Sequence, residues 1–461
     1  MEIARVTRDS VSTTSSKGKR IPVFPAEVKG KWNTRRTIVQ WGMIAIYLVL
    51  PWIKVGGHPL IQLDIEHRRF SIFGQLFFAQ EVPNLVFLTL SFLLLMGLLT
   101  AWFGRVWCGW ACPQTVFIER LFRWVERRIE GNPQKQRSLY SSEPSLDKIA
   151  KRVLKWGVFV GIALILSHSF LAYFVGSEAS YALMTRSPME HPKSFFLAML
   201  FSGVVLFDFG WFREQFCLVA CPYGRFQSVM MDDSSLFIHY DRNRTDCIDC
   251  NKCVAACPTG IDIRNGLQME CIACTSCADA CDSVMKKIHK PLGLVGYQSL
   301  KSIAGLKSRF FRFRPMIYLT GLVLCLSILG FRLYGRTPYS VEAIRAIDTP
   351  YQILSGEGGS KFLLNHFRVY LNNRGWKDLT PRVMLADSDR ESGVELIIPP
   401  GSKSNQTIGT GQGTEFDVFV KIPMQVFEAK RNSGGVALLT KWSDSLQNIT
   451  LLKWIGPQND L

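Results

Sequence analysis

The fold is decided by the stretch Cys247-Ile-Asp-Cys250-Asn-Lys-Cys253-Val-Ala-Ala-Cys257-Pro258, which is followed by Cys271-Ile-Ala-Cys274-Thr-Ser-Cys277-Ala-Asp-Ala-Cys281. Eight of the chain's 13 cysteines lie in this stretch. Each half has the C-x2-C-x2-C-x3-C spacing in which three thiolates bind one iron–sulfur cluster and the fourth binds its neighbour. A zinc site would need two C-x2-C pairs with a longer loop between them, and a disulfide framework is typical of small exported domains. The stretch therefore predicts a bacterial-type ferredoxin unit with two 4Fe-4S clusters.

The crossover in this spacing assigns four thiolates to each cluster. One set is Cys247, Cys250, Cys253 and Cys281, and the other set is Cys257, Cys271, Cys274 and Cys277. Such clusters carry one electron at a time, which predicts electron transfer. Pro258 follows the first run but Asp282 follows the second, so we expect the chain to turn differently after Cys281.

Composition outside this stretch indicates a membrane protein. The chain of 461 residues is 48% hydrophobic and holds 31 Phe and 12 Trp, which is heavy for a soluble protein. Apolar segments long enough to span a bilayer occur at 37–53, 84–103, 153–175, 194–212 and 315–331. We therefore expect five transmembrane helices, with the lipid bilayer as a partner.

The formal charge of +17 is concentrated in the segment before the first span and in two segments between spans. Basic and acidic residues number nine and three in residues 1–36, 10 and five in residues 104–152, and 14 and 10 in residues 213–315. The positive-inside rule then places the N-terminus and both cysteine-rich loops in the cytoplasm, with the C-terminal region in the periplasm. The charge is thus interpreted as a topology signal, and no nucleic-acid partner is expected.

A second cysteine motif occurs twice at an offset of 109 residues. The stretch 102–117 aligns without gaps on 211–226, with seven of 16 positions identical, and each copy follows an even-numbered span. This pattern indicates a parallel duplication of two spans. The four cysteines of the two C-x3-C-P motifs are Cys108, Cys112, Cys217 and Cys221.

An i, i+4 pair on a helix points two thiols the same way, so these four cysteines are candidate catalytic residues and metal ligands, or a pair of reactive dithiols. The alternative is that they are small buried apolar residues. The remaining cysteine, Cys325, stands alone in the last span and is interpreted as packing.

Other polar residues in or near the spans are weaker candidates. His168 and Asp208 fall inside predicted spans, where ionisable groups are rare, and could serve proton or quinone chemistry or simply bond a neighbouring helix. Met184, Met189 and His191 lie in one loop and form a copper-compatible set of thioethers and an imidazole.

The C-terminal region has alternating apolar runs, as at 367–371 and 416–420, separated by turn clusters. This pattern predicts an all-β immunoglobulin-like sandwich that serves as a docking module. The expected domains are a basic cytoplasmic tail 1–36, a four-helix membrane domain 37–235 with both C-x3-C-P motifs, a dicluster ferredoxin domain 236–300, a linker and fifth helix 301–335, and a periplasmic sandwich 336–461.

This combination of two C-x3-C-P motifs, two ferredoxin runs, a fifth span and a terminal sandwich resembles the cytochrome c oxidase accessory protein CcoG (FixG/RdxA) family. The core at 37–281 also resembles the membrane polyferredoxins related to NapH and NosR. The resemblance implies a multi-pass bacterial inner-membrane protein that assists assembly of the cbb3-type oxidase by reducing Cu(II) to Cu(I). Its implied partners are oxidase subunits or copper chaperones and an unidentified electron donor.

Three functions are compatible with these features. The first is a cupric reductase in which the C-x3-C-P cysteines hold copper as the substrate, since soft thiolates select Cu(I). The second is a quinol-oxidising electron donor to a periplasmic reductase. The third is a non-enzymatic scaffold for oxidase assembly.

Overall fold

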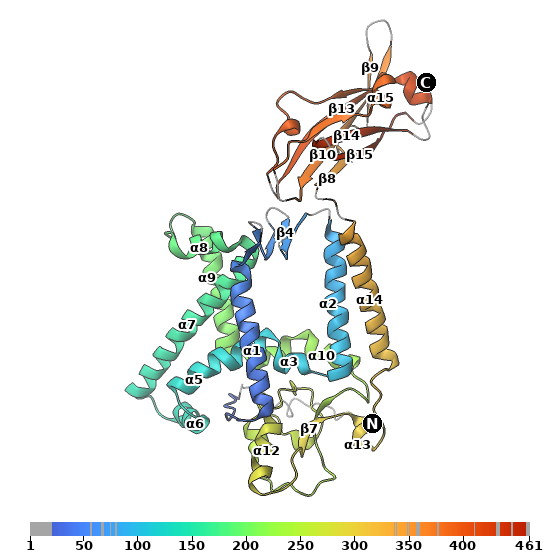
Figure 1. Ribbon diagram of the computed structural model, residues 1–461. Helices are drawn as coiled ribbons and strands as arrows, with labels where there is room; N and C mark the ends of the chain where they lie inside the picture. Colours follow the sequence, from blue (N-terminus) through green and yellow to red (C-terminus); the bar gives the residue numbers. More distant parts are fainter. Residues whose placement is uncertain are drawn as a thin grey trace. The chain divides into compact units, whose positions relative to one another are not determined.

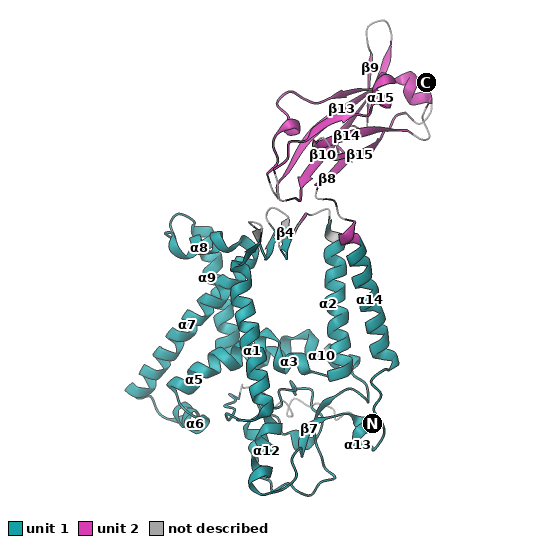
Figure 2. Ribbon diagram, viewed as in Figure 1, with its two compact units in different colours: residues 1–74, 78–331 teal, residues 75–77, 332–461 magenta. Residues whose placement is uncertain are grey.

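The computed structural model contains two compact units, which Figure 2 distinguishes by colour: residues 1–74 with 78–331, and residues 75–77 with 332–461. The residues that the structure describes are 21–55, 58–65, 69–73, 75–78, 81–335, 337, 339–347, 349, 351–355, 360–375, 378–409, 411–429, 434–443 and 446–457. Most of the predicted basic tail, residues 1–20, lies outside this range.

Four helices among the described residues are long and apolar enough to cross a membrane. They are α2 (Val82–Phe103), α7 (Leu146–Val175), α9 (Pro192–Phe207) with its π-helical continuation η5 (Asp208–Phe212), and α14 (Phe313–Tyr334). All of these helices can be followed in Figure 1. The predicted span at 37–53 corresponds to α1 (Lys31–Val49), which carries several basic residues in its first two turns. A fifth span therefore stays a prediction.

Helix α1 starts inside the stretch that is predicted as the basic tail, residues 1–36. Helix α1 begins at Lys31, and every fourth residue along one of its faces is buried, namely Arg36, Gln40 and Ile44. Arg36 is only 4% exposed because its guanidinium bonds a backbone carbonyl and faces a buried carboxylate. The last residues of the supposed tail are therefore a packed helical surface.

The segment between the first C-x3-C-P motif and α7 packs against the membrane helices. It comprises α4 (Pro113–Phe117), the π-helical turn η4 (Ile118–Phe122), α5 (Arg123–Ile129) and α6 (Pro133–Ser141). The ring of Phe122 is fully buried and packs on Phe159 of α7 with 4.7 Å between ring centroids. Burial of such rings contributes about 1.5–3 kcal/mol each, so this loop is anchored by its apolar face.

Short elements connect the helices at their other ends. The α1–α2 connection contains η2 (Leu50–Trp52), β1 (Lys54–Val55), β2 (His58–Pro59), β3 (Ile61–Asp64), β4 (Arg69–Ile72) and β5 (Gln75–Phe78). Strands β1 and β2 form an antiparallel pair, and so do β3 and β4. Helix α8 (Ser177–Thr185) joins α7 to α9.

The cysteine-rich stretch is held by a two-stranded antiparallel ribbon of β6 (Phe237–Tyr240) and β7 (Val295–Gln298). Between these strands lie α11 (Lys252–Ala255), η7 (Ile263–Asn265) and α12 (Ser276–Lys287), and α13 (Leu300–Ile303) follows β7. Helix α11 ends before the Cys257-Pro258 turn, whereas α12 runs on through Cys281 and Asp282. Asp282 accepts a hydrogen bond from Gly293 N at 2.8 Å. The chain therefore continues as a helix after the second cysteine run, whereas it turns at Pro258 after the first.

The C-terminal unit is an antiparallel two-sheet structure. One sheet has the order β12-β13-β10-β8, with β9 also paired to β10, and the other has the order β11-β14-β15. The elements are β8 (Tyr339–Arg345), β9 (Gln352–Ser355), β10 (Lys361–Asn373), β11 (Arg382–Leu385), α15 (Asp387–Glu391), β12 (Glu395–Ile397), η9 (Lys403–Asn405), β13 (Gly413–Pro423), α16 (Met424–Ala429), β14 (Gly435–Ser443) and β15 (Leu446–Lys453).

Both sheets contribute to one apolar core. Leu363 and Val418 from the first sheet and Leu438 from the second are fully buried in it. Alternate residues of β10 and β13 point into this core, as expected for strands that are half-buried. The C-terminal β-structure is thus confirmed, while an immunoglobulin-like topology stays a prediction.

Candidate metal centres

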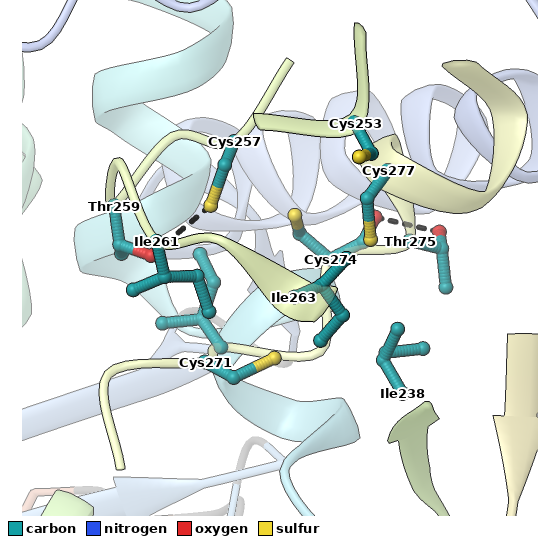
Figure 3. Close-up of a pocket in the computed structure, with 11 residues that line it drawn as sticks. Ile238, Cys253, Cys257, Thr259, Ile261, Ile263, Cys271, Cys274, Thr275 and Cys277 are labelled. Atoms are coloured by element: carbon teal, nitrogen blue, oxygen red, sulfur yellow. Dashed lines mark hydrogen bonds between the residues drawn. The ribbon is translucent and has the colours of Figure 1, made fainter. Parts of the chain in front are cut away.

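One cavity in the cysteine-rich stretch has a volume of about 340 Å³ and is lined by one of the two predicted cysteine sets. Figure 3 shows the side chains of this set around the cavity: Cys257, Cys271, Cys274 and Cys277. The remaining wall is mostly isoleucine, and Cys274 is 8% exposed. Burial raises the pKa of Cys271 to about 12, so without iron this thiol stays protonated at neutral pH. Binding to iron stabilises the deprotonated thiolate over the thiol. A buried site lined by sulfur is therefore suitable for a cluster.

A second cavity of about 380 Å³ is lined by the other predicted set, Cys247, Cys250, Cys253 and Cys281. Cys253 lines both cavities, so the two sites are adjacent. Cys250 is exposed, in contrast to the buried Cys274 of the first cavity. The two sites therefore differ in their access to solvent.

The backbone around both cavities has the same local twist. Asp249 and Asn251 in the first run have φ of 51° and 55°, and Ala273 and Thr275 at the matching places of the second run have 52° and 64°. These left-handed conformations are uncommon for residues with a side chain. Alternating right- and left-handed residues turn successive N–H groups toward one centre, a concavity that recurs at iron–sulfur sites. The donor set and the backbone both fit a cluster in each cavity.

The two C-x3-C-P motifs have the same backbone geometry. Gly104 has φ 61° and ψ −133°, and Arg213 at the matching place has φ 51° and ψ −121°. In each motif the cysteine before proline donates its backbone N–H to the carbonyl five residues earlier: Cys112 N to Trp107 O at 2.9 Å, and Cys221 N to Phe216 O at 2.8 Å. The bidentate pair between Arg213 and Glu126, at 2.6 and 3.0 Å, holds the strained arginine in place. The duplication seen in the sequence is therefore also present in the backbone conformation of the two motifs.

The expectation that each cysteine pair lies on one continuous helix is wrong. Cys108 lies in α3 (Val106–Trp110) and Cys217 in the π-helical turn η6 (Phe216–Ala220). Cys112 and Cys221 instead have extended backbone, with ψ of 126° and 113°, and precede new helices that begin with proline. The cause is steric, because a residue that precedes proline is pushed out of the helical region. The second of these helices is α10 (Pro222–Met230).

The structure nevertheless brings all four of these thiols together. Burial raises the pKa of Cys217, and the nearby thiols of Cys112, Cys108 and Cys221 raise it further. Burial and the neighbouring Cys112 likewise raise the pKa of Cys108 to about 11. The amide of Gln227, which is fully buried, donates to Cys108 Sγ at 3.3 Å and so links the two copies. We call Cys108, Cys112, Cys217 and Cys221 the cysteine quartet.

Within the described part of the chain, no three His, Cys, Asp or Glu side chains converge closely enough to hold a single metal ion. The same holds for the two ferredoxin sets, whose thiolates would each bind a different iron of one cluster.

The first C-x3-C-P motif contacts the ferredoxin loop directly through its backbone at Gly109. A Cβ atom on Gly109 would lie 2.5 Å from the carbonyl oxygen of Ile272 and 2.8 Å from the Cα of Cys274, so only glycine fits there. Gln40 of α1 donates to the carbonyl of Gly109 at 3.1 Å. A further cavity of about 280 Å³ is lined by Cys217 on one side and by Thr259, which follows Cys257, on the other.

Sequence reasoning missed a buried charge network beside this cavity. Arg123 is 3% exposed and bonds both Glu119 and Glu214, and its Nη2 also donates to Pro258 O at 3.1 Å. Burial disfavours the ionised form of Glu119, but Arg123 and Arg36 outweigh this and hold its pKa at about 2. The sequence signal that could have found the network was the i, i+4 spacing of Glu119 and Arg123 in an otherwise largely apolar stretch.

The weaker candidates lie elsewhere. His168 is 5% exposed and its Nδ1 lies 2.9 Å from Leu164 O of its own helix, while Asp208 accepts a bond from Gln114 Nε2 at 3.0 Å. Met184 and Met189 are 47% and 89% exposed. Cys325 is buried in α14, in keeping with a packing role.

Comparisons with known proteins support an iron–sulfur function. A 4Fe-4S dicluster domain family matches residues 212–246 and 242–300, and a 4Fe-4S binding domain family matches residues 84–132. RdxB of Cereibacter sphaeroides is 33% identical over 410 residues, which cover 80% of this chain and 83% of RdxB. No solved structure matches the chain.

Two further relatives match over shorter lengths. RdxA of Cereibacter sphaeroides is 36% identical over 303 residues, or 61% of this chain and 63% of RdxA. The nitrogen fixation protein FixG of Rhizobium meliloti is 34% identical over 336 residues, or 66% of this chain and 62% of FixG. The chain thus spans just under two thirds of these two proteins.

Apolar helices, thiol-lined cavities and iron–sulfur domain matches together define a membrane-bound iron–sulfur protein of electron transport. Within that class, the chain belongs to the FixG/RdxA family of membrane polyferredoxins, as the match to RdxB across four fifths of its length shows. The predicted family resemblance is confirmed.

Proposed function

We propose that this protein reduces Cu(II) to Cu(I) at the cysteine quartet, with electrons that enter through the ferredoxin unit. The observation that carries this proposal is the backbone contact of Gly109, inside the first C-x3-C-P motif, with the loop of Cys274. Soft thiolates stabilise Cu(I) over Cu(II), so a quartet next to an electron source is suited to this reduction.

In this proposal the ferredoxin unit holds two 4Fe-4S clusters. Cys247, Cys250, Cys253 and Cys281 bind one, and Cys257, Cys271, Cys274 and Cys277 bind the other. When bound, each cluster supplies a one-electron couple. The two cavities share a wall at Cys253, which supports electron exchange between the two sites.

Each Cu(II) ion accepts one electron, and the thiols of the protein are not consumed. That electron comes from a reduced one-electron carrier in the cytoplasm, or from a membrane quinol that releases two electrons and two protons for two copper ions. The quartet thiols give up their protons when copper binds, and the thiolate–copper bond offsets the burial that otherwise keeps them neutral. Gln227 directs an N–H donor at Cys108 and fixes this ligand's position.

We propose the orientation in the membrane that the charge distribution predicts. The N-terminus, the quartet and the ferredoxin unit lie in the cytoplasm of a bacterium, and the C-terminal β-structure lies in the periplasm. There it would dock oxidase subunits or copper chaperones, in keeping with a role in assembly of a cbb3-type cytochrome c oxidase.

The test is copper reduction by the purified full-length protein under anaerobic conditions. The clusters are first reduced, the excess reductant is removed, and Cu(I) formation is followed with a chromogenic chelator. The Cys108→Ser and Cys217→Ser variants should lose the reaction while they keep their iron, and Cys325→Ser should behave as the parent protein does. If both quartet variants reduce copper at the parent rate, the quartet is not the copper site.

Two alternatives predict other outcomes of the same assay. A quinol-oxidising donor would exchange electrons with a water-soluble quinone analogue and ignore copper. A scaffold without activity would reduce neither, and loss of residues 336–461 alone would abolish its effect on oxidase assembly.

A further inference from the structure

Three arginines from outside the ferredoxin unit donate hydrogen bonds to carbonyls around one cysteine cavity. Arg36 of α1 donates from Nη1 to Cys274 O at 2.8 Å, and Arg123 of α5 donates from Nη2 to Pro258 O at 3.1 Å. Arg105, between α2 and α3, donates from Nη1 to Met269 O. These carbonyls belong to, or lie within two residues of, the ligand positions 257, 271 and 274.

The charge near this cavity is positive on balance. Arg36, Arg120, Arg123 and Arg127 all act on Glu119, and three further acids lie near them: Glu214 and Glu126 beside Arg123, and Glu27 beside Arg120. These four guanidinium groups face four carboxylates, and Arg105, which acts on Cys271, adds a fifth guanidinium. Arg36 and Arg123 are 4% and 3% exposed, so solvent does little to screen them.

The other cavity has a different setting. Arg264, which lines it, is paired with Asp262 at 2.7 Å and with Asp249 at 3.0 Å, so its charge is cancelled locally. The carboxylate of Asp249 is 83% exposed, and Cys250 is exposed as well. Water reaches this site and screens charges around it.

We infer that Arg36, Arg105 and Arg123 raise the reduction potential of the site formed by Cys257, Cys271, Cys274 and Cys277 above that of the site formed by Cys247, Cys250, Cys253 and Cys281. Reduction adds one negative charge, and buried positive charges stabilise it more than screened ones do. This inference rests on the proposed electron relay, but it concerns the order of the two sites and not the identity of the final acceptor.

The order has a structural counterpart. The exposed site with Cys250 can meet a soluble electron carrier, whereas the loop of the buried site contacts Gly109, which lies next to Cys108 of the cysteine quartet. Arg105 lies close enough to both Cys271 and Cys108 to lower the pKa of each thiol, so it stands between the buried site and the quartet. We call the buried site of Cys257, Cys271, Cys274 and Cys277 the inner site, and the exposed site with Cys250 the outer site. The three arginines therefore make electron transfer from the outer site to the inner site energetically favourable.

The experiment is a potentiometric titration of the full-length protein, with electron paramagnetic resonance used to follow the two clusters separately. Arg36→Gln should shift the inner site toward lower potential by at least a tenfold change in its reduced-to-oxidised ratio, about 59 mV for one electron. Arg36→Lys, which keeps the charge, should recover most of the shift. Arg105→Gln tests the same claim at a residue that is only half-buried and therefore safer for folding.

The control is Arg242→Gln, because Arg242 is exposed and donates a hydrogen bond to the carbonyl of Arg264 in the ferredoxin unit. It should leave both potentials unchanged. The inference is overturned if Arg36→Gln and Arg105→Gln retain full iron but leave the inner potential unchanged, or if the parent protein reduces the outer site first. Copper reduction plays no part in this readout, so the inference and the proposed function can fail separately.

Discussion

Gly109 and Cys274 meet backbone to backbone: a Cβ atom on Gly109 would lie 2.8 Å from the Cα and 2.9 Å from the amide nitrogen of Cys274. Backbone atoms cannot move aside as a flexible side chain can. The contact therefore fixes how closely the first C-x3-C-P motif approaches the ferredoxin loop.

The Gly109→Ala substitution should disturb this approach. We expect a loss of about 1–3 kcal/mol of stability, the usual cost of overpacking, together with slower copper reduction because the motif and the loop move apart. Thermal unfolding and the assay described above measure the two effects. Gly42→Ala on α1 is the matched control, since nothing lies within 4 Å of its Cβ position and it should be neutral or slightly stabilising. Equal behaviour of the two variants would contradict the close contact.

Removal of the charge on Glu119 should destabilise the protein strongly. Glu119→Gln leaves Arg123 and Arg36 buried with too few carboxylates, which costs about 3–5 kcal/mol in comparable buried networks. Asp147→Asn is the matched control because Asp147 and Lys151 form an exposed i, i+4 pair, worth less than about 0.5 kcal/mol. Denaturant unfolding compares the two, and similar losses would argue against a buried network.

The same carboxylate predicts a pH dependence. Its pKa is about 2 in the folded protein against an ordinary 4.5, so ionised Glu119 stabilises the fold above pH 4.5. That contribution is lost as the pH falls from 4.5 toward 2. Unfolding measured across this window should show a steeper decline for the parent protein than for Glu119→Gln, and parallel curves would contradict the assignment.

Gln227 should affect the quartet without being a ligand. Gln227→Leu removes the donor to Cys108, and loss of such a supporting bond typically costs about 10- to 100-fold in metal affinity. Ile118 occupies the matching place in the first copy and is buried, so Ile118→Leu provides a control of similar volume. Competition with a Cu(I) chelator measures both affinities. An unchanged affinity in Gln227→Leu would mean that Cys108 does not bind the metal.

Asp279 of α12 joins the ferredoxin unit to the first helix. Its carboxylate accepts bonds from the backbone of Trp32 at 3.3 Å and Asn33 at 2.6 Å, where the N-terminus of α1 needs acceptors. Asp279→Ala should cost about 1–2 kcal/mol, as for other lost helix caps, and increase amide exchange at the start of α1. Asp282→Ala, which removes only the exposed bond to Gly293, should leave that exchange unchanged. Protection retained in Asp279→Ala would show that α1 is capped in another way.

Motifs with a fixed local spacing could be predicted from the sequence, whereas contacts between distant residues could not. The C-x2-C-x2-C-x3-C runs group the cysteines into two sets, and the structure places each set around its own cavity. The duplication at an offset of 109 recurs in the backbone of Gly104 and Arg213. Both patterns are local, so they can be recognised without knowledge of the fold.

The buried arginines could not be found in this way. Arg36 and Cys274 are 238 residues apart, and the positive-inside rule treats Arg36 as one surface charge among many. The break before Pro113 was predictable, since proline excludes helix at the residue before it. The i, i+4 spacing of Cys108 and Cys112 alone predicts one helix, but Pro113 forces extended backbone at Cys112 and ends the first helix before it.

The most direct test of the account is electron paramagnetic resonance of the reduced protein, freed of excess reductant, before and after one equivalent of Cu(II). The account predicts that the signal of the reduced clusters falls and that no Cu(II) signal appears, because the copper has taken the electron and become Cu(I). A persistent Cu(II) signal beside undiminished cluster signals would contradict it.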